Sequence, residues 1–446
     1  MTPVLPRGIR TALLKPSAQR SAGSRITVVT MTYVSSSAVT RQEIVRWRNA
    51  VLVVFTLCGI GFSSWAARVP LVASSLGLGA GQVGVLLFGG AVGSIVGLAA
   101  SGHLVMIYGA RKVMLITLLV APIMLFVGAA GATILGNFAI TFAALALYGA
   151  CIGTCDVAMN VSGAANERAL GTAIMPVFHG FFSLGTIVGA ALGALAELMG
   201  IPFALHIAAV SVIMIAAILS TIRFAQPEDH DAMPATDDAP HEPSTWRTRL
   251  SIWRDPRTIV IGLIVLGMAF AEGSANDWLA YAMVHGHNTD APTGALVFGI
   301  FVTAMTVGRL SGVKLLDRFG RVPVLRWSAV LAVVGLLMLI FIPIVWIAVI
   351  GVVLWGLGSS LGFPVGMSAA ADDPRTAAAR VSAVATIGYV AFLVGPPAIG
   401  ALGDHFGILN GLLVVLILVA VAGVASSAAR ETAATKRVTR SSVGEK

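Results

Sequence analysis

The feature that most constrains this chain is an internal repeat inside a sequence built mainly of apolar, membrane-length segments. GALAELMG (Gly193–Gly200) returns as GALGDHFG (Gly400–Gly407), and YGARKVML (Tyr108–Leu115) returns in outline as FGRVPVLR (Phe319–Arg326). The paired segments keep the same order along the chain, so the repeat predicts two like-oriented halves. Such halves are expected to form two related bundles that face each other.

Composition places these halves in a membrane. Hydrophobic residues make up 57% of the chain and charged residues 11%, whereas soluble domains carry roughly 25% charged residues. A helix needs about 20 apolar residues to cross the bilayer. We therefore expect an all-α membrane protein with twelve transmembrane helices in two six-helix bundles. The apolar runs cover residues 48–68, 81–106, 112–132, 136–162, 174–199, 201–223, 257–284, 292–316, 322–343, 345–369, 379–403 and 407–428.

Arginine and lysine gather in every second loop, and the intervening loops are nearly free of them apart from Arg68. Positive charge collects in cytoplasmic loops, so this pattern predicts that both termini are cytoplasmic. The net charge of +9 then follows from membrane topology, and we expect no nucleic-acid partner.

The polar segments outside the apolar runs divide the chain into five parts. We expect a disordered cytoplasmic tail at 1–44, a bundle at 45–223, a cytoplasmic linker at 224–256, a bundle at 257–428 and a tail at 429–446. No apolar core begins early enough for a cleaved signal peptide, so we expect none. Met31 is an alternative start of translation. Cys58, Cys151 and Cys155 all fall inside predicted spans, so we expect neither disulfides nor a metal site, and no cofactor.

The turns after the second and eighth runs carry a family pattern. The second half reads Asp317-Arg318-Phe319-Gly320-Arg321, and the first half has Met106 and Ile107 in place of the acid and first base. With twelve spans in two like-oriented halves, this resembles the major facilitator superfamily, whose turn reads approximately G-x-L-x-D-R-x-G-R-R/K. The resemblance covers about residues 45–428 and implies transport by alternating access. It also implies that the charge interaction that usually holds the outward-facing state at this turn is weakened in the first half. Expected gating residues of the two turns are Gly109, Arg111, Lys112, Asp317, Arg318, Gly320 and Arg321.

Five further segments resemble a bacterial branch of fucose-permease-like, inner-membrane transporters: WAARVP at 65–70, DVAMN at 156–160, FHGFFSLG at 178–185, EGSANDW at 272–278 and GFPVGMSAAADDP at 362–374. This resemblance implies a monomer in the bacterial cytoplasmic membrane that couples protons to symport of a sugar-like or other small polar compound. A proton-driven efflux antiporter for drugs or metabolites is the alternative, and a non-transporting sensor or scaffold is a third. The sequence contains neither a P-loop string nor HExxH spacing, so we do not expect an enzyme.

Ionisable residues inside apolar runs point to function, because hydrocarbon penalises them unless they face a cavity or a partner. Asp156 has Asn160 one turn away on the same helical face, and we expect Asp156 to couple transport to protons. The alternative is a structural pairing of Asp156 with Arg168 or His179. His179 is a second candidate for proton relay, or a histidine that merely satisfies a neighbouring carbonyl.

The seventh run carries Glu272, Asn276 and Asp277 within six positions. Glu272 and Asn276 share a face, and we expect them to bind substrate opposite Asp156 and Asn160, with Glu272 also a candidate for proton coupling. We expect at least one of the three to bind substrate, and the alternative for Asp277 is a gate residue.

Four further residues have candidate roles. In a gate, Arg68 is the expected partner of Asp277. Trp65 and Trp278 hold matching places in the two halves. We expect them to stack on a solute or to close a gate, and the alternative is that each anchors its helix at the membrane–water interface. Arg309 either extends to the cytoplasmic surface or binds an anionic substrate.

Overall fold

The computed structural model describes residues 40–172, 174–226, 252–372 and 376–430. Within these residues, twelve helices are long and apolar enough to cross a membrane, which confirms the twelve predicted spans. Most of both predicted tails and of the 224–256 linker lies outside the described residues.

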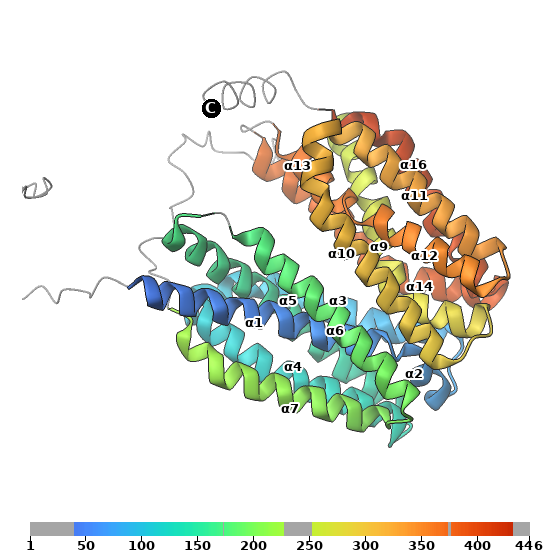
Figure 1. Cartoon of the computed structure of the whole chain (residues 1–446), viewed down its shortest axis with the longest axis horizontal. Coiled ribbons are helices and arrows are strands. Elements are labelled where there is room, and N and C mark those ends of the chain that lie inside the picture. Colours follow the sequence, from blue (N-terminus) through green and yellow to red (C-terminus); the bar gives the residue numbers. More distant parts are fainter. Residues whose placement is uncertain (1–39, 173, 227–251, 373–375, 431–446) are drawn as a thin grey trace, which may run out of the picture. The chain divides into compact units, whose positions relative to one another are not determined.

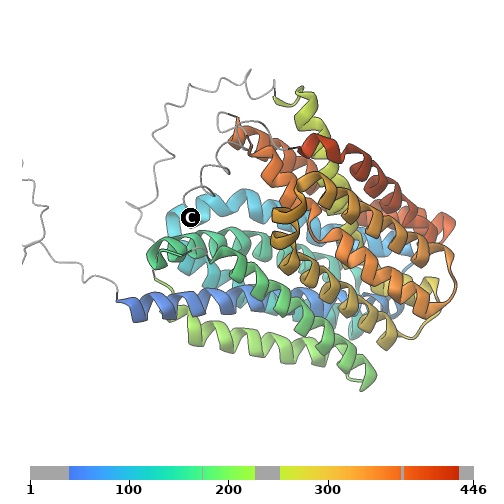
Figure 2. The same cartoon turned by 45° about the horizontal axis from the view of Figure 1, so that its top comes forward.

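The first bundle contains six membrane-length helices and one short helix. They are α1 (Arg41–Ala66), α2 (Val69–Leu76), α3 (Ala80–Tyr108), α4 (Ala110–Thr133), α5 (Phe138–Leu170), α6 (Met175–Leu198) and α7 (Phe203–Thr221), with a 3-10 turn at Ile222–Phe224. Figure 1 shows α4 beside α7 in this bundle, and Figure 2 shows α7 beside α1. The short α2 continues the direction of the chain after α1 is interrupted at Arg68, where Pro70 begins the next helical turn.

The second bundle repeats this plan with two interrupted spans. It contains α9 (Pro256–Gly286), α10 (Ala291–Phe319), α11 (Arg321–Phe341), α12 (Val345–Ser359), α13 (Gly362–Ala370), α14 (Ala377–Phe406), α15 (Ile408–Gly411) and α16 (Leu413–Ala425), followed by a 3-10 turn at Ser426–Ala429. Helices α12 and α13 form one span, as do α15 and α16.

One boundary differs from the sequence-based expectation. Helix α1 begins at Arg41, so residues 41–44 are helical instead of belonging to a disordered tail. The hydroxyl of Thr40 accepts from the backbone N–H of Glu43, and the Glu43 carboxylate accepts from the backbone N–H of Thr40. This reciprocal capping box satisfies two free backbone donors and extends the helix beyond its apolar run.

The internal repeat returns in backbone geometry. Gly109 and Gly320, in the two family-pattern turns, have φ of 77° and 78°, and Gly200 and Gly407, at the ends of the other repeated segment, have φ of 65° and 85°. Residues that carry a side chain rarely adopt a positive φ, so glycine permits the same sharp turn in both halves. We call the end of the bundles that carries Gly109 and Gly320 the basic end, and the opposite end the far end.

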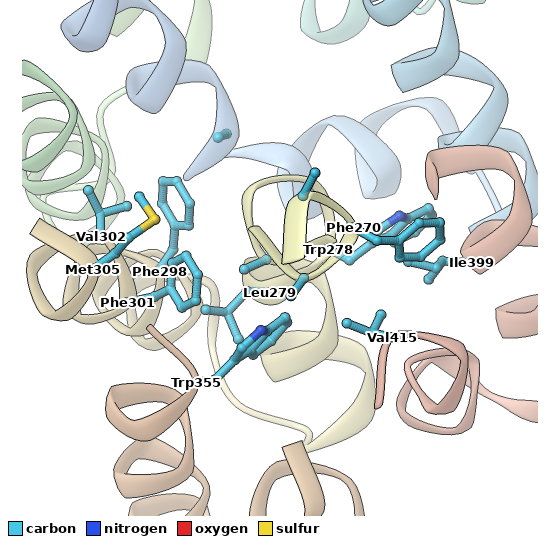
Figure 3. Close-up of a cluster of buried hydrophobic side chains, with 14 of the residues drawn as sticks. Phe270, Trp278, Leu279, Phe298, Phe301, Val302, Met305, Trp355, Ile399 and Val415 are labelled. Carbon is cyan, nitrogen blue, oxygen red and sulfur yellow. The ribbon is translucent and has the colours of Figure 1, made fainter. Parts of the chain in front are cut away.

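Each bundle packs internally through small residues and aromatic side chains. In the first bundle, a Cβ at Gly189 of α6 would lie 2.5 Å from the carbonyl oxygen of Ile60 in α1. In the second, Figure 3 shows Phe298, Phe301, Trp355 and Leu279 together, and the rings of Phe301 and Trp355 lie 5.3 Å apart. Each of these contacts lies within one bundle.

The bundles approach each other through α3 and α14, and through α6 and α10. At the far end of the first pair, a Cβ at Gly84 would lie 2.5 Å from the carbonyl oxygen of Pro396, and one at Gly400 would lie 2.6 Å from the carbonyl oxygen of Ala80. Only glycine allows backbones to approach this closely. The far end is therefore closed by direct contact between the two bundles.

Candidate functional site

A cavity of about 320 Å³ lies between the bundles and is lined by both. The first bundle contributes α1, α2, α3 and α5, and the second contributes α9 and α14. Five aromatic side chains form much of its wall: Phe62, Trp65, Tyr148, Tyr389 and Phe392. The cavity therefore lies where the two repeat-related halves meet.

Two polar side chains of α9, Asn276 and Asp277, reach this cavity. Asp277 is half-buried, and no described residue forms an ion pair or hydrogen bond with its carboxylate. Burying a carboxylate without a partner is costly. Asp277 is therefore the most exceptional polar group in the cavity wall.

The expected partner of Asp277 is engaged elsewhere. Arg68 is buried and forms an ion pair with Glu197 of α6. Its guanidinium also donates to the carbonyl oxygen of Ile201 at 3.3 Å and lies 5.4 Å from the ring centre of Phe203. The suggested Arg68–Asp277 gate is therefore wrong, because Arg68 fixes the α1–α2 break to the α6–α7 turn inside the first bundle.

The two repeat-related tryptophans have different surroundings. Trp65 lines the cavity and packs against Phe203 at a ring distance of 5.3 Å. Trp278 is fully buried, away from the cavity wall, and meets the ring of Tyr281 edge-to-face at 5.5 Å. Figure 3 shows Trp278 beside Phe270 and Ile399 in the core of the second bundle. Of the pair, only Trp65 is placed to contact a solute.

Glu272 lies one helical turn from Asn276, on the basic side of the cavity. Its carboxylate accepts a hydrogen bond of 2.7 Å from Arg309 of α10, so Arg309 is an ion-pair partner and does not extend freely to a membrane surface. His179 of α6 has an exposed ring, which meets Phe55 edge-to-face at 5.2 Å and interacts electrostatically with Arg309. Neither Glu272 nor His179 belongs to the cavity wall.

Asp156 and Asn160 also lie on the basic side, one and two turns beyond Ile152 of the cavity wall. The Asn160 amide donates to the backbone oxygen of Asp156 at 2.8 Å and to its carboxylate at 3.3 Å. Asp156 also interacts electrostatically with Tyr389 of the other bundle. No described cation pairs with it, including Arg168 and His179. We call Asp156, His179, Glu272 and Arg309 the ionisable layer.

The turn residues divide into paired and unpaired groups. Arg321 donates to the carboxylate of Asp372 at 2.6 Å, and Arg257 reaches the other oxygen at 3.0 Å. The side chain of Asp372 is only 2% exposed, so this triad joins the basic ends of α9, α11 and α13. Arg111 and Lys112 form no ion pair with any described residue, and Asp317 and Arg318 are exposed.

Sequence reasoning missed several of these residues for a physical reason. Tyr148, Tyr389 and Phe392 are aromatic residues in apolar runs, and nothing in their spacing separates a cavity wall from a lipid-facing surface. Asp372 was visible only as part of the segment 362–374, and its two arginine partners lie far away in sequence.

Comparison with known proteins gives the family. The sequence pattern described as Major Facilitator Superfamily matches residues 50–372 and 272–445. An uncharacterized MFS-type transporter of Yersinia pestis is 31% identical over 350 residues, which cover 78% of this chain and 86% of that protein. Membrane protein MosC of Rhizobium meliloti is 25% identical over 85% of this chain and 89% of its own length.

Solved structures agree at the level of the fold. A mutant of the nucleoside transporter NupG aligns with a TM-score of 0.68 at 15% identity, over 85% of this chain and 99% of NupG. The fucose:proton symporter FucP of E. coli aligns with a TM-score of 0.58 at 17% identity, over 88% of this chain and all of the other (100%). From its sequence and its fold, the chain belongs to the Major Facilitator Superfamily.

Proposed function

We propose that this chain is a secondary active transporter that carries one small solute across the bacterial cytoplasmic membrane by alternating access. The observation that supports this most is the cavity between the bundles, because residues of both halves contribute to its wall. When the two bundles rock about such a site, the same residues face one side of the membrane and then the other. Trp65, Asn276 and Asp277 are the proposed solute contacts.

We further propose that transport is coupled to protons through the ionisable layer. Asp156 is the first candidate, because no described cation pairs with it and its amide partner Asn160 holds it in place. Glu272 is the second, since a proton on its carboxylate would release Arg309. His179, next to Arg309, would follow that change. The likeness in fold to a fucose:proton symporter supports coupled uptake of a small polar compound.

The orientation follows from the charged loops. In this proposal the basic end is cytoplasmic, the units that rock are residues 45–223 and 257–428, and the chain acts as a monomer. Tight α3–α14 contact at the far end then corresponds to a cavity sealed from the outside. Labelling of single cysteines in the turns at Gly109 and Gly320 from the cytoplasmic side tests this orientation.

Proton movement on solute addition tests the function itself. Full-length protein is reconstituted in liposomes that contain a pH-sensitive dye, and sugars, nucleosides, organic acids and amines are added in turn. We expect at least one solute to move protons in the native protein but not in Asp277→Asn liposomes. Glu43→Gln, which preserves the capping box, is the matched control. Exchange of labelled solute without any proton movement would contradict coupling, and absence of both would contradict transport.

A further inference from the structure

The charges around the cavity are unbalanced. The wall contains one acid, Asp277, and no lysine, arginine or histidine among its described residues. Arg68 and Arg309 each have an acid of their own, Arg68 with Glu197 and Arg309 with Glu272. The Asp277 carboxylate is therefore left without a counter-charge among the described residues.

The rest of the wall fits a cation with an apolar body. Five aromatic side chains surround the space. The faces of aromatic rings attract cations, and the attraction grows when water is excluded. A carboxylate, aromatic faces and one further acceptor, the Asn276 amide oxygen, match the donors of an ammonium group.

The size of the cavity limits the ligand. Its volume of about 320 Å³ is at the lower end of ligand pockets, which range over roughly 300–1,000 Å³. The solute is therefore compact, with one ring or a fused ring system. An anionic solute would meet the Asp277 carboxylate without any cation to receive its own charge, and a neutral solute would leave that carboxylate unpaired.

We infer that the solute is a compact organic ammonium ion, held by a charge-assisted hydrogen bond to Asp277 with its body between Trp65, Tyr148, Tyr389 and Phe392. This inference rests on the proposed function, because it names the solute class of the same cavity. It separates the solute site from the ionisable layer, because Asp156 of that layer does not line the cavity.

Matched pairs of amines and alcohols test the inference in native, full-length protein. The probes are benzylamine and benzyl alcohol, 1-aminoadamantane and 1-adamantanol, and glucosamine and glucose. Within each pair the shape is nearly constant and only the charge changes. Binding is followed by melting temperature and by the fluorescence of the native tryptophans, one of which, Trp65, lines the cavity. We expect at least one amine to raise the melting temperature at concentrations where its alcohol does not.

The variants assign that binding to one carboxylate. Asp277→Asn should weaken amine binding by about tenfold or more, because a hydrogen bond to a charged group contributes about 1.5–3 kcal/mol. Asp277→Glu should restore part of the affinity, and the control Glu43→Gln should bind as the native protein does. The amine–alcohol comparison in native protein does not depend on whether Asp277→Asn folds.

Each outcome decides one claim. Alcohols that bind as well as their amines, amine binding that survives Asp277→Asn, or no binding by any amine would overturn the ammonium assignment. A neutral probe that is then transported in liposomes would still support the proposed function. An amine that binds through Asp277 but is never transported would instead contradict the proposed function and leave the binding site in place.

Discussion

Glu197 and Asp404 occupy matching positions in the repeated segments, yet only Glu197 has a cationic partner in its own half. Glu197 pairs with Arg68, and the position that matches Arg68 in the second half is Tyr281. Asp404 interacts electrostatically with Tyr281 but reaches across to the other bundle, where a Cβ at Gly79 would lie 3.0 Å from its carboxylate oxygen. Asp404, which has no described arginine partner of the kind that Glu197 has, thus contacts the start of α3.

The two helix starts that match each other are capped differently. Asp290 caps α10 by accepting from the backbone N–H of Thr293 at 3.1 Å, and hydrogen bonds from Thr293 lower the pKa of the Asp290 carboxyl. Gly79, at the start of α3, has no side chain with which to do this. The N-terminus of a helix attracts negative charge, so Asp404 supplies from the second bundle the anion that α3 lacks.

The first prediction is that Asp404 helps to hold the far end closed. A charge at a helix terminus contributes about 0.3–1 kcal/mol, so Asp404→Asn should shift the equilibrium about two- to fivefold toward an open far end. Distances between spin labels at the starts of α3 and α15 measure this shift. Asp290→Asn, which affects a cap within one bundle, is the control. An unchanged distance distribution in Asp404→Asn would remove Asp404 from the closure.

The second prediction concerns the close contact of α3 with α14. Gly84→Ala should prevent full closure, because its Cβ would lie 2.5 Å from the Pro396 carbonyl oxygen, and such a contact cannot be relieved by a side-chain movement. Gly102→Ala on the same helix is a matched control, since nothing lies within 4 Å of the added carbon. The same spin-label distance should lengthen only for Gly84→Ala. Equal behaviour of the two variants would show that the far end closes elsewhere.

The third prediction concerns stability. Arg68→Ala would leave Glu197 with its side chain 14% exposed and without its counter-ion, and breaking a buried pair in this way costs about 3–5 kcal/mol. We expect a clearly lower melting temperature. The double variant Arg68→Met with Glu197→Leu should recover most of the loss, because an apolar pair of similar size needs no counter-charge. A single variant as stable as the native protein would show that the pair contributes little.

The sequence predicts the spans well and the pairings poorly. Apolar length and turn glycines such as Gly109 and Gly320 are local features, so twelve helices and the repeat could be read directly. A polar residue in an apolar helix indicates only which face turns inward. For that reason Asn276 and Trp65 could be expected at an inward-facing surface, and both line the cavity. The partner of Arg68 could not be predicted, because its pairing with Glu197 depends on how α6 packs against α1.

The glycines give a second example. The stripe Gly185, Gly189 and Gly193 is conspicuous in the sequence, but it packs α6 against α1 within one bundle. The contact between bundles uses Gly84 and Gly400, which stand among many other glycines of α3 and α14. Spacing alone does not tell which helix will face a glycine, since tertiary packing decides this.

The central claim is that protonation of the ionisable layer drives solute movement through the cavity, and Asp156→Asn tests it most directly. The variant keeps a polar side chain of equal size but cannot carry the proton. Liposomes with native or variant protein receive labelled solute, with and without an imposed pH gradient. We predict that the native protein accumulates solute against its gradient, and that Asp156→Asn exchanges solute but accumulates none. Accumulation by Asp156→Asn equal to that of the native protein would contradict the account.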